Sequence, residues 1–296
     1  MRQPEQMMAT TDRIKEEIRK PQSMTLVMIR EAFYNAVFWV KIIDRLESEL
    51  KRYGIRMSIF IADDATDPCE IQENCKTDGY IVMGLVSSKV LEGLEKHGLP
   101  IILLDHKYID TSHDHIRINN RLGMKRMVSR ILELGHRSML FMGDMDFAAS
   151  YRERFTGAME ALNDHPEMDP VIRHVLIQNG LKSIEERDAF LKAIRSEDPP
   201  TVLIGANDMI SLEAIEVLKK AGIRVPEDIS VVGFDNISEA NFAEPKLTTV
   251  DVSKIDLAVV TVETILRKYE QPERPNMLIM IEPKLIERNS LVERRT

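Results

Sequence analysis

Short apolar runs alternate with stretches of helical periodicity along the chain, and this alternation constrains the fold more than any other feature. Strands are predicted for residues 25–29, 57–62, 80–83, 101–104, 138–142, 201–204, 229–234 and 277–281. Apolar residues at helical spacing lie between them, most clearly Trp39, Ile43, Leu46 and Leu50, which precede Gly54. Repeated strand–helix–strand order is typical of parallel sheets. The sequence therefore predicts an α/β fold of Rossmann-like lobes with parallel sheets.

The length of the chain predicts more than one core. At 296 residues it exceeds one ordinary domain, and the alternating pattern divides at about residue 136 into series of similar size. We expect residues 23–136 with 251–275 to form an N-terminal lobe, and residues 137–250 with 276–296 to form a C-terminal lobe. Residues 1–22 are expected to be a linker or residual N-terminal segment. Crossovers between the lobes are inferred near residues 137, 250 and 276, with a cleft between the lobes.

Charge and hydropathy exclude several classes of partner. The net charge of -8 disfavours binding of phosphate backbones by this chain, because that binding requires clustered Lys and Arg. Every apolar run is far shorter than the roughly 20 residues of a membrane span, and no secretory signal is visible. Cys69 and Cys75 lack C-x-x-C spacing, so reduced thiols are expected. We expect a cytoplasmic protein without membrane contacts.

The stretch of residues 223–250 points to a binding site. Its apolar run, residues 229–234, reads as a buried strand that stops at Asp235 and Asn236. Ligands of open α/β sheets bind at the carboxyl ends of the strands. Asp235 is therefore a candidate ligand-binding residue, although a turn or cap role beside Asn236 remains an alternative.

Several segments together resemble one family. They are LELGHRSMLFMGD, SYRERFTGAMEAL, VPEDISVVGFDN, PKLTTV and LIERNS, in that order. Over residues 24–290 the chain resembles the effector-binding core of the lactose-repressor/galactose-repressor (LacI/GalR) family of transcription regulators. The resemblance implies a periplasmic-binding-protein-like type I fold, a small-molecule effector, a homodimer and an N-terminal helix-turn-helix that binds operator DNA. Residues 1–22 show no helix-turn-helix pattern, so either the chain is a shortened form of a longer regulator or the protein has lost its DNA-binding domain, and we favour the shortened form.

The resemblance and the strand ends together select the C-terminal-lobe candidates. Arg154 precedes Gly157 in the family's R-x-x-G pattern, and its guanidinium can grip adjacent hydroxyls or a carboxylate; the alternative is a surface arginine. Asn207 stands where the family has an Asn-Asp pair, and its amide suits a sugar hydroxyl. A helix cap is the alternative for either member, and we assign the cap to Asp208 and the ligand to Asn207.

Candidates from the N-terminal lobe are Phe38 and Asn119. Phe38 and Trp39 occupy the place of family aromatics that could stack on a ligand, and Phe38 is preferred because Trp39 belongs to the apolar helical stripe. Asn119 replaces a common family aspartate. Leu181 falls where relatives often have an aromatic ring, which favours a sugar or sugar derivative over a purine. The segment 67–78 is short, so the second helix of this lobe is expected to be shortened or lost.

Catalytic motifs are absent from the sequence. It contains no G-x-S-x-G, P-loop or G-x-G-x-x-G, so we expect neither an enzyme nor a cofactor. His106, His113, Asp114 and His115 form the one metal-like cluster, for which a solvated loop is the preferred interpretation and no metal is expected. The leading hypothesis is the ligand-sensing, dimerising core of a transcription regulator, with a carbohydrate as the expected effector. The alternative is a sugar-binding protein of a transport system, which the sequence upstream would distinguish.

Overall fold

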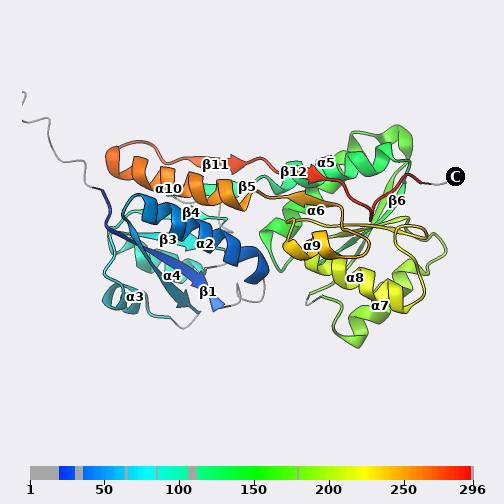
Figure 1. Cartoon of the computed structure of the whole chain (residues 1–296), viewed down its shortest axis with the longest axis horizontal. Coiled ribbons are helices and arrows are strands. Elements are labelled where there is room, and N and C mark those ends of the chain that lie inside the picture. The colour runs from blue at the N-terminus through cyan, green and yellow to red at the C-terminus, as the bar shows by residue number, and fades with distance from the viewer. Residues whose placement is uncertain are drawn as a thin grey trace, which may run out of the picture. The chain divides into compact units, whose positions relative to one another are not determined.

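The computed structural model describes residues 20–30, 36–63, 66–84, 86–105, 112–178 and 180–294 (Figure 1). Residues 1–19 of the expected N-terminal segment, and His106, lie outside this part of the chain. The described residues form two compact units. Of the described residues, the first unit contains 20–30, 39–117 and 255–279, and the second contains 36–38, 118–254 and 280–294. Each is an α/β unit, which confirms the predicted fold class.

The first unit boundary differs from the one predicted. The chain enters the second unit at Ile118 rather than after residue 136. It goes back to the first unit at Ile255 and enters the second unit again at Met280. Helix α5 (Asn120–Glu133) therefore belongs to the second unit. Its partner there is α6 (Ala149–Asn163), where Gly157 allows a close approach because any Cβ would collide with the backbone of Arg121. Apolar residues at helical spacing indicate that α5 has a buried face, but they do not indicate in which unit that face packs.

The first unit is built on a six-stranded sheet in the order β11-β5-β4-β3-β1-β2. The strands are β1 (Ser23–Ile29), β2 (Arg56–Ala62), β3 (Gly79–Met83), β4 (Ile101–Leu104), β5 (Asp114–Ile118) and β11 (Leu278–Ile281). Its helices are α2 (Ala36–Arg52), α3 (Pro68–Asn74), α4 (Ser88–Glu95) and α10 (Lys254–Glu270). Strands β1 to β5 pair in parallel. With 7 residues, α3 confirms the shortening predicted from the segment 67–78.

The buried side of α2 is not the predicted stripe. Phe38, Ile42, Leu46 and Leu50 are buried, whereas Trp39 is only partly buried. Spacing of four, four and four brings these side chains to one side of the helix. The predicted set shared Leu46 and Leu50 but started one residue too late. The prediction that Trp39, rather than Phe38, packs in the core is therefore wrong.

The second unit is built on a four-stranded parallel sheet in the order β7-β6-β8-β9. The strands are β6 (Ser138–Met142), β7 (Val171–Val175), β8 (Val202–Gly205) and β9 (Ser230–Val232). Helices α5, α6, α7 (Ile184–Ile194), α8 (Asp208–Lys220) and the short α9 (Ser238–Phe242) complete it, with a 3-10 turn at Pro166–Met168. A separate antiparallel pair joins β10 (Thr249–Asp251) to β12 (Lys284–Ile286).

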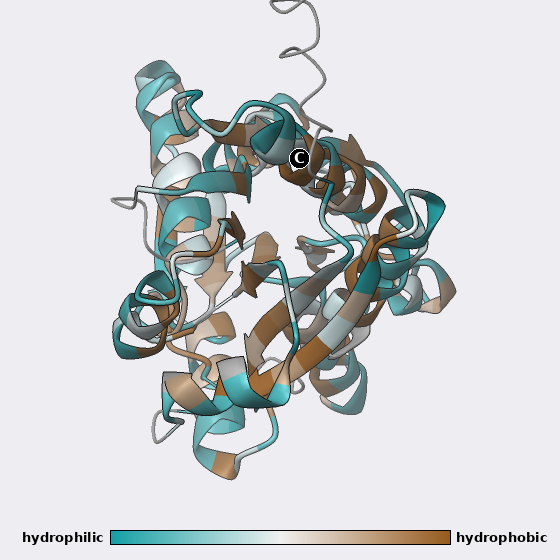
Figure 2. Cartoon of the chain, turned by 90° about the vertical axis from the view of Figure 1, so that its left-hand side faces the viewer, coloured by the Kyte–Doolittle hydropathy of each residue, from teal (hydrophilic) through white to brown (hydrophobic). Residues whose placement is uncertain are grey.

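Burial explains why these strands were visible in the sequence. Every residue of β3, β4, β8 and β9 is buried, as expected for parallel strands covered on both faces. Figure 2 shows brown strand segments and many teal helix surfaces. Among the described residues, no helix is long and apolar enough to cross a membrane.

Candidate functional site

Arg154 lies at the centre of a buried polar cluster at the carboxyl edge of the second unit's sheet. Its side chain is 4% exposed and comes from α6. Nε donates to Asn120 Oδ1 (2.9 Å), Nη1 to Ala206 O (2.6 Å) and Nη2 to Asp235 Oδ1 (2.9 Å). The guanidinium carbon also lies 3.8 Å from the centroid of the Phe234 ring, within the range of a cation–π contact. The alternative of a surface arginine is therefore wrong.

Asp235 follows β9 and faces Arg154 from a turn with unusual backbone angles. Its φ is 112° and that of Asn236 is 49°, a left-handed conformation that non-glycine residues rarely adopt. The Asp235 N–H donates to Val250 O (2.9 Å), and Lys254 Nζ donates to the Asp235 carbonyl. Burial raises the pKa of Asp235, while the positive charges of Arg154 and Lys254 oppose this increase. The carboxyl group is thus held near cations in a largely desolvated position.

Asn207 is the N-cap of α8, which corrects the assignment of that cap to Asp208. Asn207 Oδ1 accepts from Ile210 N (2.9 Å), and its backbone has the extended angles of a cap residue. Its Nδ2 donates to Tyr151 Oη (2.7 Å). Asp208 is already helical and its carboxylate accepts from Ile237 N (2.9 Å) instead. The sequence identified the Asn-Asp pair but could not show which of the two side chains caps the helix.

Asn120, rather than the predicted Asn119, belongs to the Arg154 cluster. Asn119 caps α5 by accepting from Leu122 N (3.1 Å). Asn120 accepts from Arg154, and its Nδ2 donates to Glu153 Oε2 (3.0 Å). The adjacent asparagines offered no signal to separate these roles.

Tyr151 is a second residue that the sequence analysis missed. It lies three positions before Arg154 on α6, a spacing that places both on one face of a helix. Burial raises the pKa of its hydroxyl, which accepts the hydrogen bond of Asn207. The three-residue spacing between Tyr151 and the candidate Arg154 was the signal in the sequence that could have identified Tyr151.

Phe38 belongs with the second unit and is 9% exposed. Lys254 Nζ lies 5.2 Å from the centroid of its ring.

Leu181 is 4% exposed and its N–H donates to Glu213 Oε2 (2.7 Å). A buried leucine at that position offers no aromatic platform, as the sequence indicated.

The histidine–aspartate segment is not the solvated loop that was predicted. Asp114 and His115 are buried in β5, and Asp114 pairs with Arg274. Strand pairing with β4 explains their burial, since His115 lies opposite Leu103. No cluster of potential metal ligands occurs among the residues with described positions.

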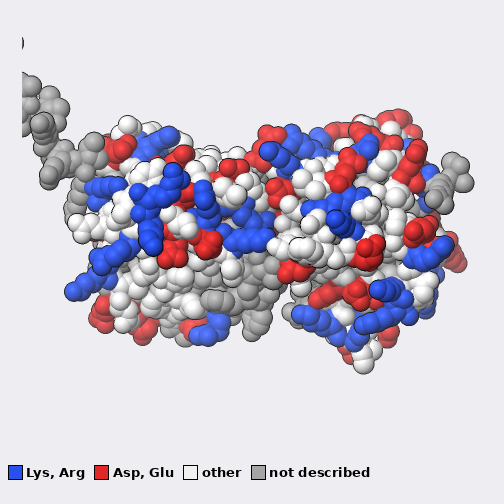
Figure 3. Space-filling view, in the orientation of Figure 1, with Lys and Arg blue, Asp and Glu red and all other residues white. Residues whose placement is uncertain are grey.

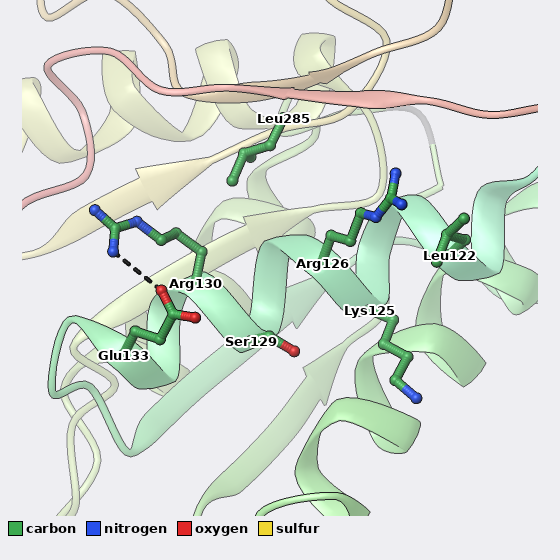
Figure 4. A pocket seen from close by; sticks show the side chains of 7 residues that line it. All are labelled: Leu122, Lys125, Arg126, Ser129, Arg130, Glu133 and Leu285. Carbon is green, nitrogen blue, oxygen red and sulfur yellow. Dashed lines mark hydrogen bonds and ion pairs between the residues drawn. The ribbon is translucent and has the colours of Figure 1, made fainter.

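A shallow groove of about 390 Å³ on the outer side of α5 is unrelated to the cluster. Figure 4 shows its lining by Leu122, Lys125, Arg126, Ser129, Arg130, Glu133 and Leu285. Its cations already pair with acidic residues: Lys125 with Asp164 (2.6 Å), Arg126 with Glu282 (2.6 Å) and Arg130 with Glu133 (3.0 Å). It contains none of the candidate site residues.

Fold and cluster together define a class of protein. Parallel α/β units, with charged and amide side chains gathered at the strand ends of one sheet, are typical of ligand-binding proteins. The periplasmic binding protein-like domain model matches residues 128–291. The chain belongs to this family.

Known relatives and solved structures confirm the resemblance to LacI-type regulators. The chain is 27% identical to the HTH-type transcriptional repressor PurR of Vibrio atlanticus (strain LGP32), over 86% of this chain and 78% of the relative. A LacI family transcriptional regulator from Enterococcus faecium, solved with bound ribose, has a TM-score of 0.79 at 21% identity, covering 92% of this chain and 100% of that one. The regulator CelR, solved with cellobiose, has a TM-score of 0.78 at 21% identity, covering 98% and 92% of the respective chains.

Proposed function

We propose that this chain is the effector-sensing core of a bacterial LacI-type transcription regulator, and that its effector is a sugar or sugar derivative. The relatives are named as transcriptional regulators, and solved relatives carry ribose or cellobiose. These names favour regulation over the transport-system alternative and over catalysis. The effector alters operator binding by a helix-turn-helix domain that precedes this core in the complete regulator.

The Arg154–Asp235 pair carries this proposal. Arg154 binds only Oδ1 of Asp235, whose side chain is 12% exposed; within the described part of the chain no donor is bonded to Oδ2. That oxygen is available to accept from a sugar hydroxyl, and the hydrogen bond would be charge-assisted. Asn207 and Arg154 supply neighbouring N–H groups, so adjacent hydroxyls of one sugar ring could be recognised together. Phe38 and Asn119 remain candidates for further contacts.

The position of Asp235 also supports a sensing role. Its backbone pairs with Asp251 of β10, and Lys254 at the end of that segment donates to its carbonyl. The chain leaves the second unit directly after Lys254. A ligand that binds Asp235 therefore acts beside a segment that connects the units. If the ligand binds one conformation of this segment more tightly, it increases the fraction of the regulator in that conformation.

We propose that the regulator is a cytoplasmic homodimer. The edge strand β2 carries Ile59 and Ile61, which are 47% and 39% exposed, and contact with another copy would bury such side chains. Figure 3 shows blue and red side chains intermingled on the face drawn, rather than a broad basic surface, which favours DNA contact through a separate domain.

Calorimetry with D-ribose and cellobiose, after a thermal-shift screen of other sugars and sugar phosphates, tests the proposal. We expect one of these compounds to bind the wild-type chain, and Asp235→Asn to weaken that binding by about tenfold to a hundredfold because a charge-assisted hydrogen bond is lost. Asp228→Asn is the matched control, since Asp228 is an exposed aspartate of the same unit that pairs with Arg224. Unchanged affinity of Asp235→Asn would remove Asp235 from the site, and the absence of binding by any sugar would refute the proposed effector class.

A further inference from the structure

Asp208 is a fully buried carboxylate that is not itself a candidate for effector contact. Its exposed fraction is 0%, and it lies at the start of α8, directly after Asn207. Isolated buried carboxylates are costly, so such a group is retained where its hydrogen bonds are needed. The hydrogen-bond partners of Asp208 indicate its role.

Hydrogen bonds of Asp208 converge on the turn that carries Asp235. Asp208 Oδ2 accepts from Ile237 N (2.9 Å), two residues after Asp235, and the Asp208 N–H donates to Phe234 O (2.7 Å), one residue before it. Asp208 thus holds the turn on both sides of Asp235 and Asn236, the residues with positive φ. A strained turn of this kind persists only where surrounding contacts fix it.

The same carboxylate also binds the strand beside the turn. Thr249 Oγ1 donates to Asp208 Oδ1 (2.5 Å), and Thr249 belongs to β10. Gly233 leaves the space that Oδ1 occupies, because a Cβ at that position would collide with it. Asp208 therefore joins the N-terminus of α8, the β9 turn and β10 at one point.

We propose that Asp208 is a positioning residue of the effector site, which fixes the Asp235 carboxylate opposite Arg154 by holding the turn against β10. This inference depends on the proposed role of Asp235 as an effector ligand. Asp208 acts through Ile237 and Thr249 and makes no contact with the effector.

The charge of Asp208 makes this arrangement sensitive to pH. Burial, and to a smaller extent the negative charge of Asp235, raise its pKa to about 7, while the bonds from Thr249 and Ile237 and the charge of Lys254 oppose the increase. Asp235 and Lys254 are the charged groups that face it from the β9 turn and from the start of α10. Protonation removes one acceptor, so the Ile237 and Thr249 bonds weaken as the pH falls through about 7.

Effector titrations at pH 6 and pH 8 with D-ribose and cellobiose test the proposal in four variants. Asp208→Asn keeps the size of the side chain but replaces one acceptor with a donor, and we expect about a tenfold to hundredfold loss of affinity at pH 8. The loss should be much smaller at pH 6, where the wild-type carboxyl is itself protonated. Thr249→Val should weaken binding and Thr249→Ser, which retains the hydroxyl donor, should restore it. Asp228→Asn should match the wild type.

Amide hydrogen exchange gives a measurement that does not depend on the effector. In the wild type, protection of the Ile237 N–H should increase as the pH rises through about 7, after correction for intrinsic exchange. In Asp208→Asn that protection should be lost and independent of pH, while β6 and β8 stay protected. General loss of protection would indicate unfolding, and Thr249→Val, which leaves the carboxylate in place, then decides the question.

The outcomes separate this inference from the proposed function. If the wild type binds no sugar of the screen, the proposed effector class is refuted, and the Ile237 exchange profile still decides whether Asp208 fixes the turn. If Asp208→Asn retains wild-type affinity, or wild-type protection at Ile237 at every pH, the positioning role of Asp208 is refuted.

Discussion

Two buried arginine–aspartate pairs, one in each unit, use their carboxylate oxygens differently. In the first unit Arg274 binds both oxygens of Asp114, at 2.9 Å and 3.0 Å, and Met277 N donates to Oδ1 at 2.9 Å. In the second unit Arg154 binds only Oδ1 of Asp235, at 2.9 Å. The exposed fractions of the aspartate side chains are 0% and 12%.

This difference separates a structural pair from a binding pair. Every oxygen of Asp114 has a donor, so an added ligand would have to displace a bond that already exists. Among the residues that the structure describes, no donor is bonded to Oδ2 of Asp235, and this side chain keeps partial access to solvent. Burial of an ion pair is therefore weak evidence for a site on its own, and the unused acceptor is the informative feature.

Removing the arginine of the structural pair should have the largest effect. Arg274→Met leaves Asp114 buried without its partner, and we expect a loss of about 3–5 kcal/mol in the free energy of unfolding of the first unit. Urea unfolding followed by the fluorescence of Trp39, the one tryptophan in the chain, measures this unit. A loss below about 1 kcal/mol would place this pair with exposed ion pairs instead.

Asp235→Asn should have the opposite profile, with a large effect on affinity and a small one on stability. The variant retains an oxygen that can accept from Arg154, but loses the charge that a sugar hydroxyl would meet. We expect affinity for D-ribose or cellobiose to fall by about tenfold to a hundredfold in calorimetry. If Asp114→Asn reduced affinity as much as Asp235→Asn while leaving stability intact, the distinction between the pairs would fail.

The pH dependence of stability should also distinguish the second unit. The pKa of Asp208 is raised by burial from 3.8 to about 7, and that of Asp235 is also raised. A raised carboxyl pKa means that the folded state holds the proton more tightly, so this contribution is fully present below pH 3.8 and is lost as the pH rises through about 7. Urea midpoints between pH 4 and pH 8, monitored by far-UV circular dichroism, should show a smaller decline in Asp208→Asn than in the wild type.

The exposed pair of Arg224 and Asp228 should show the smallest effect. Hydrogen bonds from Arg224 lower the pKa of Asp228 to about 2, so its contribution is present above pH 3.8 and is lost as the pH falls through about 2. We expect Arg224→Gln to leave sugar affinity unchanged and to shift the urea midpoint at pH 7 only slightly. A shift as large as that of Arg274→Met would show that exposure does not separate these pairs.

Fully buried strands were easier to predict from the sequence than polar strand residues or the boundary between the units. Buried parallel strands such as β4 and β6 were predicted at their observed bounds, because covering both faces requires continuous apolar runs. Asp114 and His115 of strand β5 were expected in a solvated loop, because these polar residues are buried only through pairing with Arg274 and neighbouring strands. The unit boundary was misplaced because the periodicity of α5 does not reveal which sheet it covers.

The sequence by itself determined the parallel α/β class, the family resemblance, the positions of Asn207 and Asp235 after strands of one sheet, and the position of Arg154 in the helix that follows a third strand. These features depend on local apolar patterning and on motifs in order, which a linear chain records directly. Only the tertiary structure decided that Asn207 caps α8 and that Asn120 rather than Asn119 accepts a hydrogen bond from Arg154. It also decided that Asp208 bonds to the turn that carries Asp235. Those roles depend on the direction of one side chain relative to distant segments, and on whether an oxygen already has a donor, which neither spacing nor composition specifies.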